Sequence, residues 1–298
     1  MFFKPVKSIC KLQLFRLRIA SLFFFLHYDA RHGIGAHRPA SQRITAMMKQ
    51  MLIAAMLAAS AAGAAQGEEH APGHSTHWTY SGKTGAPHWG DLQPDYATCK
   101  LGREQSPINI RGAVKADLPP IGFQYVDRPA DVVNTGHTVQ VNVPDGGAIS
   151  LATGQYAFVQ LHFHTPSEER INGKAYPLVA HLVHRNAAGK LAAIAVLFKE
   201  GKANPVLKRV FPAMPAGVNA PKPLPGGLNV ADLLPADRGY YAFVGSLTTP
   251  PCSEDVQWRV LKQPVELSRA QLAAFKRLYP MNARPLQPLN ARTIQASR

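Results

Sequence analysis

Three histidines in this chain have the spacing of a metal site. His162 and His164 are separated by one residue, and His181 follows seventeen residues after His164. The run 156–164 is rich in aromatic and β-branched residues, which predicts a strand. Side chains alternate between the two faces of a strand, so both imidazoles point to one face while Leu161 and Phe163 point to the other. One metal ion can bridge two imidazoles at that separation.

His181 lies in a second strand-like run, residues 178–183, which follows a turn predicted at residues 172–173. A neighbouring antiparallel strand would place His181 beside the histidine pair. Three imidazoles form a zinc site whose fourth position is left for water, as in catalytic rather than structural sites. Gln160 shares the face of the pair and can accept the second ring N–H of a ligand histidine. Because the chain holds 12 histidines, the pair alone is weak evidence, and the surrounding motifs must decide.

Several ordered motifs accompany the histidines. They are Gln105-Ser106-Pro107-Ile108-Asn109-Ile110, Ser167-Glu168, His181-Leu182-Val183-His184, Ser246-Leu247-Thr248-Thr249-Pro250-Pro251 and Pro285-Leu286-Gln287-Pro288-Leu289-Asn290. Together with His162-Phe163-His164 they closely resemble the signature of the bacterial, exported α-class carbonic anhydrases, over about residues 77–294. The resemblance implies a zinc lyase that converts carbon dioxide reversibly to bicarbonate and a proton by means of a zinc-bound hydroxide.

The resemblance also implies roles for single residues. Zn²⁺ would be held by His162, His164 and His181. Thr248 matches a threonine that accepts a hydrogen bond from the hydroxide and donates its own proton to the carboxylate at Glu168. His137 matches the histidine that passes a proton to buffer through a chain of waters. Without the resemblance, Thr248 would be read as part of a proline-stiffened turn, Glu168 as a solvated charge and His137 as an ordinary turn residue.

The positions that bind substrate in the family are matched by five residues. They are Val183, Leu247, Thr249, Val256 and Trp258. One position departs from the family, which normally has a glutamate two residues before its third ligand to accept that histidine's free ring N–H. Here the residue is Val179, on the same strand face as His181, so we expect the carboxylate to be missing. A backbone carbonyl or a trapped water would then accept the N–H, and zinc would be held more loosely.

The N-terminal segment has the features of an export signal that begins within the chain. Met51 to Ala65 is an apolar, alanine-rich run that follows Met47-Met48-Lys49 and ends in small residues. We therefore expect residues 1–46 to be a mis-called extension, 47–67 a signal peptide, and 68–298 the enzyme domain. A genuine basic leader is the alternative for residues 1–46. The expected location is periplasmic or secreted.

Charge changes when the signal is removed. Residues 1–67 hold nine Lys or Arg and one Asp, so the net charge falls from +15 to +7. No basic run interleaved with aromatic residues remains, and the partners expected are carbon dioxide and bicarbonate, with no nucleic acid and no membrane. A homodimer is left open.

The cysteines agree with export. Removing the leader takes away Cys10 and leaves Cys99 and Cys252, an even pair in an exported chain. In bacterial and extracellular members of the family these two positions form a disulfide.

The strand-like runs outnumber the helical ones and predict a fold class. Strands are expected at 138–143, 158–164, 178–183, 192–198, 240–244 and 256–261. Only residues 268–279 read clearly as an amphipathic helix, with Ser268 as its N-cap. The Pro- and Gly-rich stretch 212–227 is expected to be a surface loop. This pattern predicts a single β-dominated α+β domain, which the resemblance sharpens to a large, mostly antiparallel twisted sheet with a few short peripheral helices.

Two alternatives to the enzyme remain. A catalytically weak carbonic-anhydrase-like binding module is one, although such modules typically lose a zinc histidine and all three are present here. A site that only stores zinc is the other. Thr248, Glu168 and His137 argue against it, because zinc storage does not require them.

Overall fold

The computed structural model describes residues 77–298. The expected extension (1–46), the expected signal (47–67) and the start of the expected domain lie outside these residues. Among the described residues, no helix is both long and apolar enough to cross a membrane.

Strands dominate the described chain. They are β1 (Asn109–Ile110), β2 (Val114–Ala116), β3 (Gly122–Tyr125), β4 (Arg128–Asn134), β5 (Val139–Asn142), β6 (Gly147–Leu151), β7 (Gly154–His164), β8 (Arg170–Ile171), β9 (Leu178–Arg185), β10 (Leu191–Glu200), β11 (Lys222–Leu228), β12 (Tyr240–Gly245), β13 (Val256–Leu261), β14 (Val265–Leu267) and β15 (Gln295–Ser297). The α-helices are α2 (Trp89–Leu92), α3 (Thr98–Leu101), α4 (Pro205–Val210) and α5 (Arg269–Lys276). Short 3₁₀ helices lie at Gly82–Thr84, Ala86–His88, Pro94–Tyr96, Phe211–Ala213 and Val230–Leu233.

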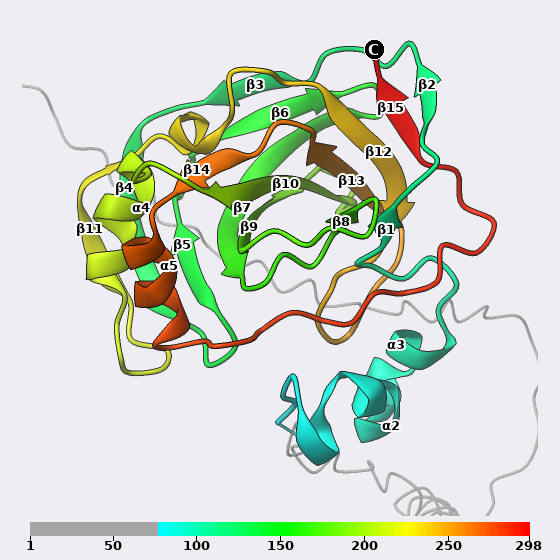
Figure 1. Ribbon diagram of the computed structural model, residues 1–298, viewed down its shortest axis with the longest axis horizontal. Helices are drawn as coiled ribbons and strands as arrows, with labels where there is room; N and C mark the ends of the chain where they lie inside the picture. The colour runs from blue at the N-terminus through cyan, green and yellow to red at the C-terminus, as the bar shows by residue number, and fades with distance from the viewer. Residues whose placement is uncertain (1–76) are drawn as a thin grey trace, which may run out of the picture. The chain divides into compact units, whose positions relative to one another are not determined.

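Thirteen strands form one twisted sheet (Figure 1). Its main path runs β11-β4-β5-β7-β9-β10-β13-β12-β15-β2, with β3, β6 and β14 off this path. Three pairs, β10–β13, β10–β14 and β15–β2, are parallel, and the remaining pairs of this sheet are antiparallel. The prediction of a β-dominated α+β fold on a mostly antiparallel sheet is therefore confirmed.

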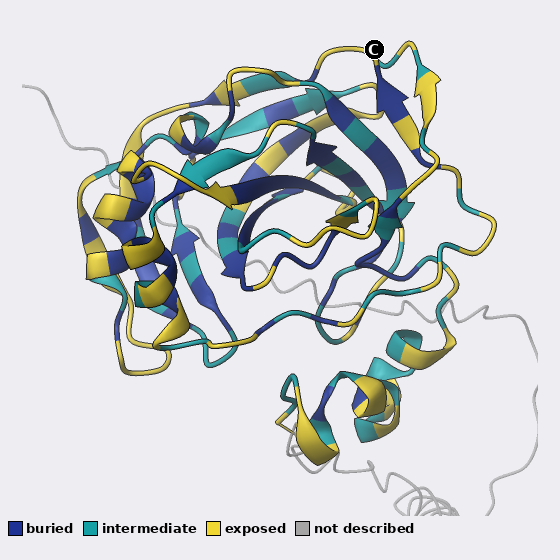
Figure 2. Ribbon diagram, in the orientation of Figure 1, coloured by how far each residue is buried: buried dark blue, intermediate teal, exposed yellow. Residues whose placement is uncertain are grey.

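The middle of the sheet is buried on both faces, as the dark strands of Figure 2 show. In β10, every residue from Ala192 to Phe198 is buried. Alternate side chains enter two separate apolar clusters. The larger one includes Leu161, Phe163, Leu182, Ile194 and Phe275 and is covered by α4 and α5. The smaller one includes Ile108, Val179, Ala195, Val256 and Trp258.

The predicted helix is confirmed, although it ends earlier than expected. Ser268 caps α5 in a reciprocal capping box with Gln271, which satisfies two backbone N–H groups at the helix start. The expectation of a surface loop over 212–227 is wrong in its second half, because Lys222–Leu228 forms β11 against β4. Pro223 and Pro225 are tolerated there because β11 is an edge strand, where a missing N–H breaks no ladder on the open side.

Candidate metal centre and active site

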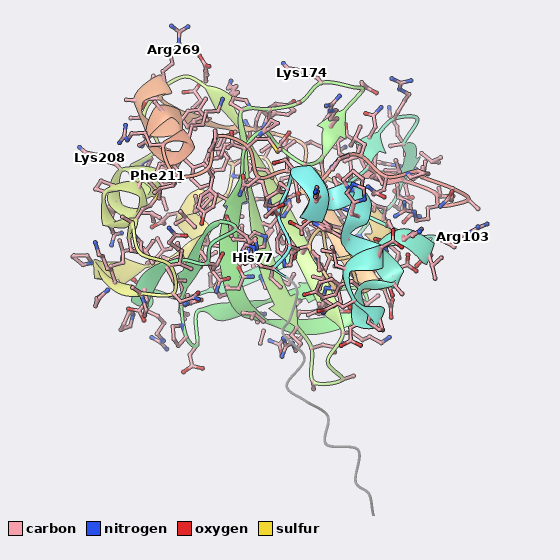
Figure 3. All side chains as sticks on the ribbon, turned by 90° about the horizontal axis from the view of Figure 1, so that it is seen from below. His77, Arg103, Lys174, Lys208, Phe211 and Arg269 are labelled. Atoms are coloured by element: carbon pink, nitrogen blue, oxygen red, sulfur yellow. A yellow bond between two sulfur atoms is a disulfide. The ribbon has the colours of Figure 1, made fainter. Side chains whose placement is uncertain are left out.

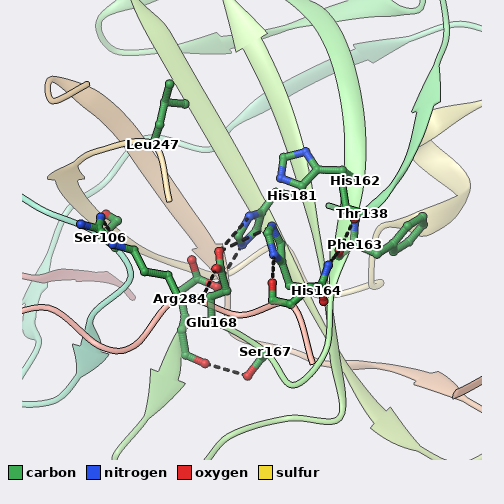
Figure 4. A network of polar contacts seen from close by, with 12 residues as sticks. Ser106, Thr138, His162, Phe163, His164, Ser167, Glu168, His181, Leu247 and Arg284 are labelled. Atoms are coloured by element: carbon green, nitrogen blue, oxygen red, sulfur yellow. Dashed lines mark hydrogen bonds and ion pairs between the residues drawn. The ribbon is translucent and has the colours of Figure 1, made fainter. Parts of the chain in front are cut away.

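The strand register brings the three histidines together. β7 and β9 are antiparallel neighbours, and His162 lies directly opposite His181. The connection between these strands includes the predicted turn, where Asn172 and Gly173 both have positive φ (51° and 83°). One ring nitrogen from each of His162, His164 and His181 lies within 4.8 Å of the others, a span that one ion can bridge (Figure 4).

The other nitrogen of each ring has a protein partner. The pairs are His162 Nδ1 with Gln160 Oε1 (2.9 Å), His164 Nδ1 with the Asn282 carbonyl (2.7 Å) and His181 Nε2 with Glu169 Oε2 (3.1 Å). Each ring N–H donates to an oxygen, so the free lone pairs are Nε2 of His162 and His164 and Nδ1 of His181. Nε2 of His164 is buried and has no hydrogen-bond partner among the described residues. A buried acceptor left without a donor is what a metal ligand requires before its ion arrives, so the donor set fits zinc.

Burial and charge act differently on the three rings. Burial, together with the smaller effect of the neighbouring histidines, lowers the pKa of His162 to about 3 and that of His164 well below its usual value. His162 nevertheless keeps some solvent exposure. Burial also acts to lower the pKa of His181, but the negative charges of Glu169 and Glu168 outweigh it and raise that pKa. Two of the rings are thus held in the neutral form that binds metal ions.

Glu168 lies against the same site. Its Oε2 is 3.5 Å from His164 Nε2 and 3.8 Å from His181 Nδ1. Burial raises the pKa of Glu168 to about 7, although a hydrogen bond from the Arg284 backbone N–H to Oε1 (2.7 Å) and the nearby Thr248 hydroxyl favour its charged form. The Thr248 hydroxyl lies close to this carboxylate, and Oε2 has no hydrogen bond of regular geometry in the described part of the chain.

The expectation that His181 lacks a carboxylate partner is wrong. Val179 packs in the smaller apolar cluster, but Glu169 reaches Nε2 of His181 from the loop that follows β7. Strand alternation placed Val179, which has no carboxylate, on the same face of β9 as His181. It carried no information about a loop that approaches from another side.

Comparison with known proteins identifies the family. Residues 84–298 match the model of the eukaryotic-type carbonic anhydrase family. The chain belongs to this family. A carbonic anhydrase of Pectobacterium carotovorum is 43% identical over 221 residues, which are 74% of this chain and 91% of the relative, and one of Nostoc is 39% identical over 226 residues, 74% and 86% of the two chains. The α-carbonic anhydrase of Thermovibrio ammonificans, solved with the inhibitor sulfanilamide, aligns with a TM-score of 0.72 at 46% identity, covering 74% of this chain and 99% of that one. These relatives support carbonic anhydrase activity and catalysis of carbon dioxide hydration.

Among the other residues that resemble carbonic anhydrase site positions, Trp258 contacts the His181 ring. Trp258 meets this ring edge-on, with centroids 4.9 Å apart, and its indole N–H donates to the Ser246 carbonyl (3.0 Å). Val256 is buried in the same apolar cluster as Trp258, and Leu247 packs against it. Val183 and Thr249 are partly exposed.

The predicted shuttle residue of this carbonic anhydrase fold lies in the turn between β4 and β5. His137 is half-buried, and its ring stacks on that of Trp78 with centroids 3.6 Å apart. Its Nε2 donates to the Trp78 carbonyl (2.9 Å), and the exposed His77 ring lies 5.1 Å away (His77 is labelled in Figure 3). Burial lowers the pKa of His137, and the positive charge of a protonated His77 lowers it further.

A disulfide joins Cys99 and Cys252, as the resemblance implied. Cys252 closes a turn by donating its backbone N–H to the Thr249 carbonyl (2.8 Å), so the bridge ties the threonine-bearing loop to α3. The buried Arg284 guanidinium strengthens this connection through bonds to the Gln105 side chain (2.9 Å) and to the Ser106 (2.7 Å) and Cys99 (3.0 Å) carbonyls.

Three residues that hold the site together were not found from the sequence. Glu169 orients His181, Arg284 connects Glu168 to the N-terminal helices, and Asn282 connects His164 to the shuttle turn. Asn282 does this by accepting from His164 Nδ1 and by donating to the His137 carbonyl (3.1 Å). Asn282 and Arg284 stand in an irregular segment after α5, where no periodicity reveals orientation. Their one signal was their place directly before the matched motif 285–290.

Proposed function

We propose that this protein catalyses the reversible hydration of carbon dioxide to bicarbonate and a proton, using Zn²⁺ held by His162, His164 and His181. The observation that carries the proposal is the convergence of three imidazole lone pairs on one point, beside a buried carboxylate and a threonine hydroxyl. Zinc bound there would supply the positive charge that lowers the pKa of a coordinated water to about 7, which is the established value for carbonic anhydrase itself.

Glu168 and Thr248 would control which groups can occupy the site. The Arg284 backbone N–H holds the Glu168 carboxylate by one oxygen, which leaves the other oriented toward the histidines. When the Thr248 hydroxyl donates its proton to this carboxylate, its own oxygen is left as an acceptor. Such an acceptor selects for a group that carries a proton, and hydroxide carries one while most simple anions do not.

The apolar side chains would provide a niche for carbon dioxide. The niche would be formed by aliphatic and aromatic side chains, those of Val183, Leu247, Val256 and Trp258. The one N–H among them, on the Trp258 indole, donates to a backbone carbonyl. These side chains offer no hydrogen bond to water. Carbon dioxide can therefore displace water from this surface without breaking a protein–water hydrogen bond. Thr249 would contribute the polar boundary of the niche.

His137 would accept the proton that hydration releases and pass it to buffer. Its half-buried position lets it exchange protons with solvent, and the direction of its pKa shift means that it releases a proton readily at neutral pH.

Export is part of the proposal. The Cys99–Cys252 bridge is typical of proteins that fold outside the cytosol, and residues 47–67 have the composition of a signal peptide. Protein recovered from a host periplasm should begin between residues 65 and 68. It should also carry no titratable thiol until it is denatured and reduced. A free thiol at Cys99 would contradict export in the folded, bridged form.

Zinc removal tests the catalytic proposal. Chelator-treated protein should lose carbon dioxide hydration and regain it with Zn²⁺, and His164→Ala should bind less than one equivalent of zinc and show no hydration above the uncatalysed rate. Glu266→Gln, at a partly exposed position of β14, is a matched control that should hydrate normally. A sulfonamide should inhibit, as sulfanilamide does for the Thermovibrio relative. Full activity in His164→Ala would refute the metal assignment, and zinc uptake without hydration would favour the binding module.

A further inference from the structure

His181 is held between the carboxylates of two consecutive residues. Glu169 Oε2 lies 3.1 Å from Nε2 on one side of the ring, and Glu168 Oε2 lies 3.8 Å from Nδ1 on the other. All three side chains are almost completely buried, with exposures of 1% for His181 and 0% for both carboxylates. Figure 4 shows the polar contacts that converge on this ring.

The Glu169 carboxylate has little other reason to be buried there. A buried carboxylate is destabilising unless it is paired, and Glu169 Oε1 has no hydrogen-bond partner among the described residues. Within residues 77–298, the contact between Oε2 and the His181 ring N–H is therefore the one hydrogen bond that compensates for burying the Glu169 carboxylate. A buried ion that stabilises the fold poorly is better explained by what it does to its partner.

The loop is built to deliver this carboxylate. Ser167 Oγ donates to the Glu169 carbonyl (2.8 Å) and accepts from the Tyr176 N–H (2.9 Å), while the Ser167 N–H donates to the Tyr176 carbonyl (2.8 Å). These three bonds fix the backbone on both sides of Glu168 and Glu169. One short segment thus sets the position of both carboxylates that face His181.

We propose that Glu169 is the positioning residue for His181. From its place in the loop it performs the role of the carboxylate that the family normally has at position 179, where this chain has valine. It would keep the proton on Nε2, leave Nδ1 as the metal-binding lone pair, and slow the release of zinc. This inference depends on the proposed function in one respect, which is that zinc binds the three histidines. It replaces the expectation of a loosely held zinc, because the acceptor is a carboxylate and not a carbonyl or water.

Zinc release from the loaded protein tests the proposal without using activity. Three variants are compared with the native protein by transfer of zinc to a chelator. Glu169→Gln keeps an acceptor oxygen but removes the charge. Glu169→Gln/Val179→Glu returns a carboxylate to the ring from β9. Glu266→Gln is the matched control, an equivalent charge loss on the surface.

We expect Glu169→Gln to release zinc roughly 10–100-fold faster, the usual effect of losing a partner behind a metal ligand. The double variant should return toward the native rate, and Glu266→Gln should release zinc at the native rate. The pH midpoint of hydration should also move to lower pH in Glu169→Gln and back in the double variant. A ligand with less electron density leaves the metal more positive, and a purely structural role for Glu169 would not move this midpoint.

Native release from Glu169→Gln would overturn the proposal, as would faster release that Val179→Glu fails to reverse. If Glu169→Gln does not fold, the native protein labelled with ¹⁵N-histidine decides. His181 should then carry its proton on Nε2 in slow exchange with solvent, and a proton on Nδ1 or fast exchange would overturn the proposal. A native protein that takes up no zinc at all would instead refute the proposed function.

Discussion

The two faces of β9 carry histidines in opposite surroundings. His181 faces the metal site and lies between two carboxylates, whereas His184, three residues later, faces the large apolar cluster. His184 Nε2 lies 2.8 Å from the Tyr125 hydroxyl, and the Phe158 ring meets it edge-on at 5.5 Å. Both imidazoles are buried, yet the pKa of His181 is raised while burial lowers that of His184 to about 3. Burial alone therefore does not make an imidazole useful for chemistry, and the charges placed beside it decide.

The same division holds on β7. His164 points to the site, and its chain neighbour Phe163 points into the large cluster, where it packs on Phe211 (5.5 Å between centroids) and Phe275 (6.1 Å). One face of the two strands thus carries the ligands beside the smaller apolar cluster, and the other face packs in the larger cluster. The sheet fixes where each side chain points, and the loops bring the groups that tune it.

Phe163→Ala tests whether packing and metal binding are separate on β7, and its effect on stability is expected to be the largest. Truncating a fully buried phenylalanine leaves a cavity in the large cluster and should lower the free energy of unfolding by roughly 3–5 kcal/mol. At low temperature, where the variant stays folded, zinc should still bind at one equivalent. Denaturant unfolding and metal analysis of the same sample measure both quantities.

His164→Ala is the reciprocal variant. It should lose zinc while its metal-free form unfolds at nearly the same denaturant concentration as metal-free native protein. If Phe163→Ala lost zinc under folding conditions, or His164→Ala collapsed in stability, the two faces would not be separable.

Much of this division could be predicted from the sequence, because it depends on strand periodicity. Alternation along 156–164 correctly separated His162 and His164 from Leu161 and Phe163. The expected antiparallel neighbour places His181 beside the pair, and its register sets His181 opposite His162. The same rule placed Val179 on the face of His181, and the structure shows it packed there in the smaller apolar cluster.

What could not be predicted came from segments without periodicity. Glu169 follows Glu168 in a loop, and adjacent residues are expected to diverge, yet this loop brings both carboxylates to opposite ends of one ring. The second half of 212–227 was misread because proline and glycine signal a loop, although an open sheet edge accepts both. Asn282 and Arg284 use both side-chain and backbone groups, and they stand in an irregular segment where no periodicity shows which way those groups point.

A smaller effect is expected at His137, which lies on neither face but in the turn between β4 and β5. His137→Ala should lower the maximal hydration rate roughly 10–100-fold in dilute buffer while leaving kcat/KM nearly unchanged, because proton disposal follows the carbon–oxygen step. Added imidazole should restore the rate. His88→Ala is a suitable control, since it removes another exposed histidine of the N-terminal segment. An unchanged rate in dilute buffer would move the shuttle to His77 or to the buffer itself.

The smallest expected effect is the pH dependence of stability caused by His184 on β9. The unfolded chain binds a proton at His184 with a pKa of 6.5, whereas the folded pKa is about 3. Below pH 6.5 the unfolded state therefore binds more protons, so stability falls as the pH decreases from 6.5 toward 3 and is constant above that range. Between pH 6 and pH 5 this one group should remove about 1 kcal/mol.

The test compares native protein with His184→Leu/Tyr125→Phe by denaturant unfolding at each pH. The double variant removes both members of the buried hydrogen bond, so neither a polar atom without a partner nor a titrating ring is left in the cluster. The difference in unfolding free energy between the two proteins should shrink or change sign in favour of the variant as the pH falls below 6.5. Other titrating groups, including the three histidines at the site, are common to both proteins and cancel in this difference. A difference independent of pH would mean that the large cluster tolerates a charged His184. Burial would then not be what keeps the His184 ring neutral in the folded protein.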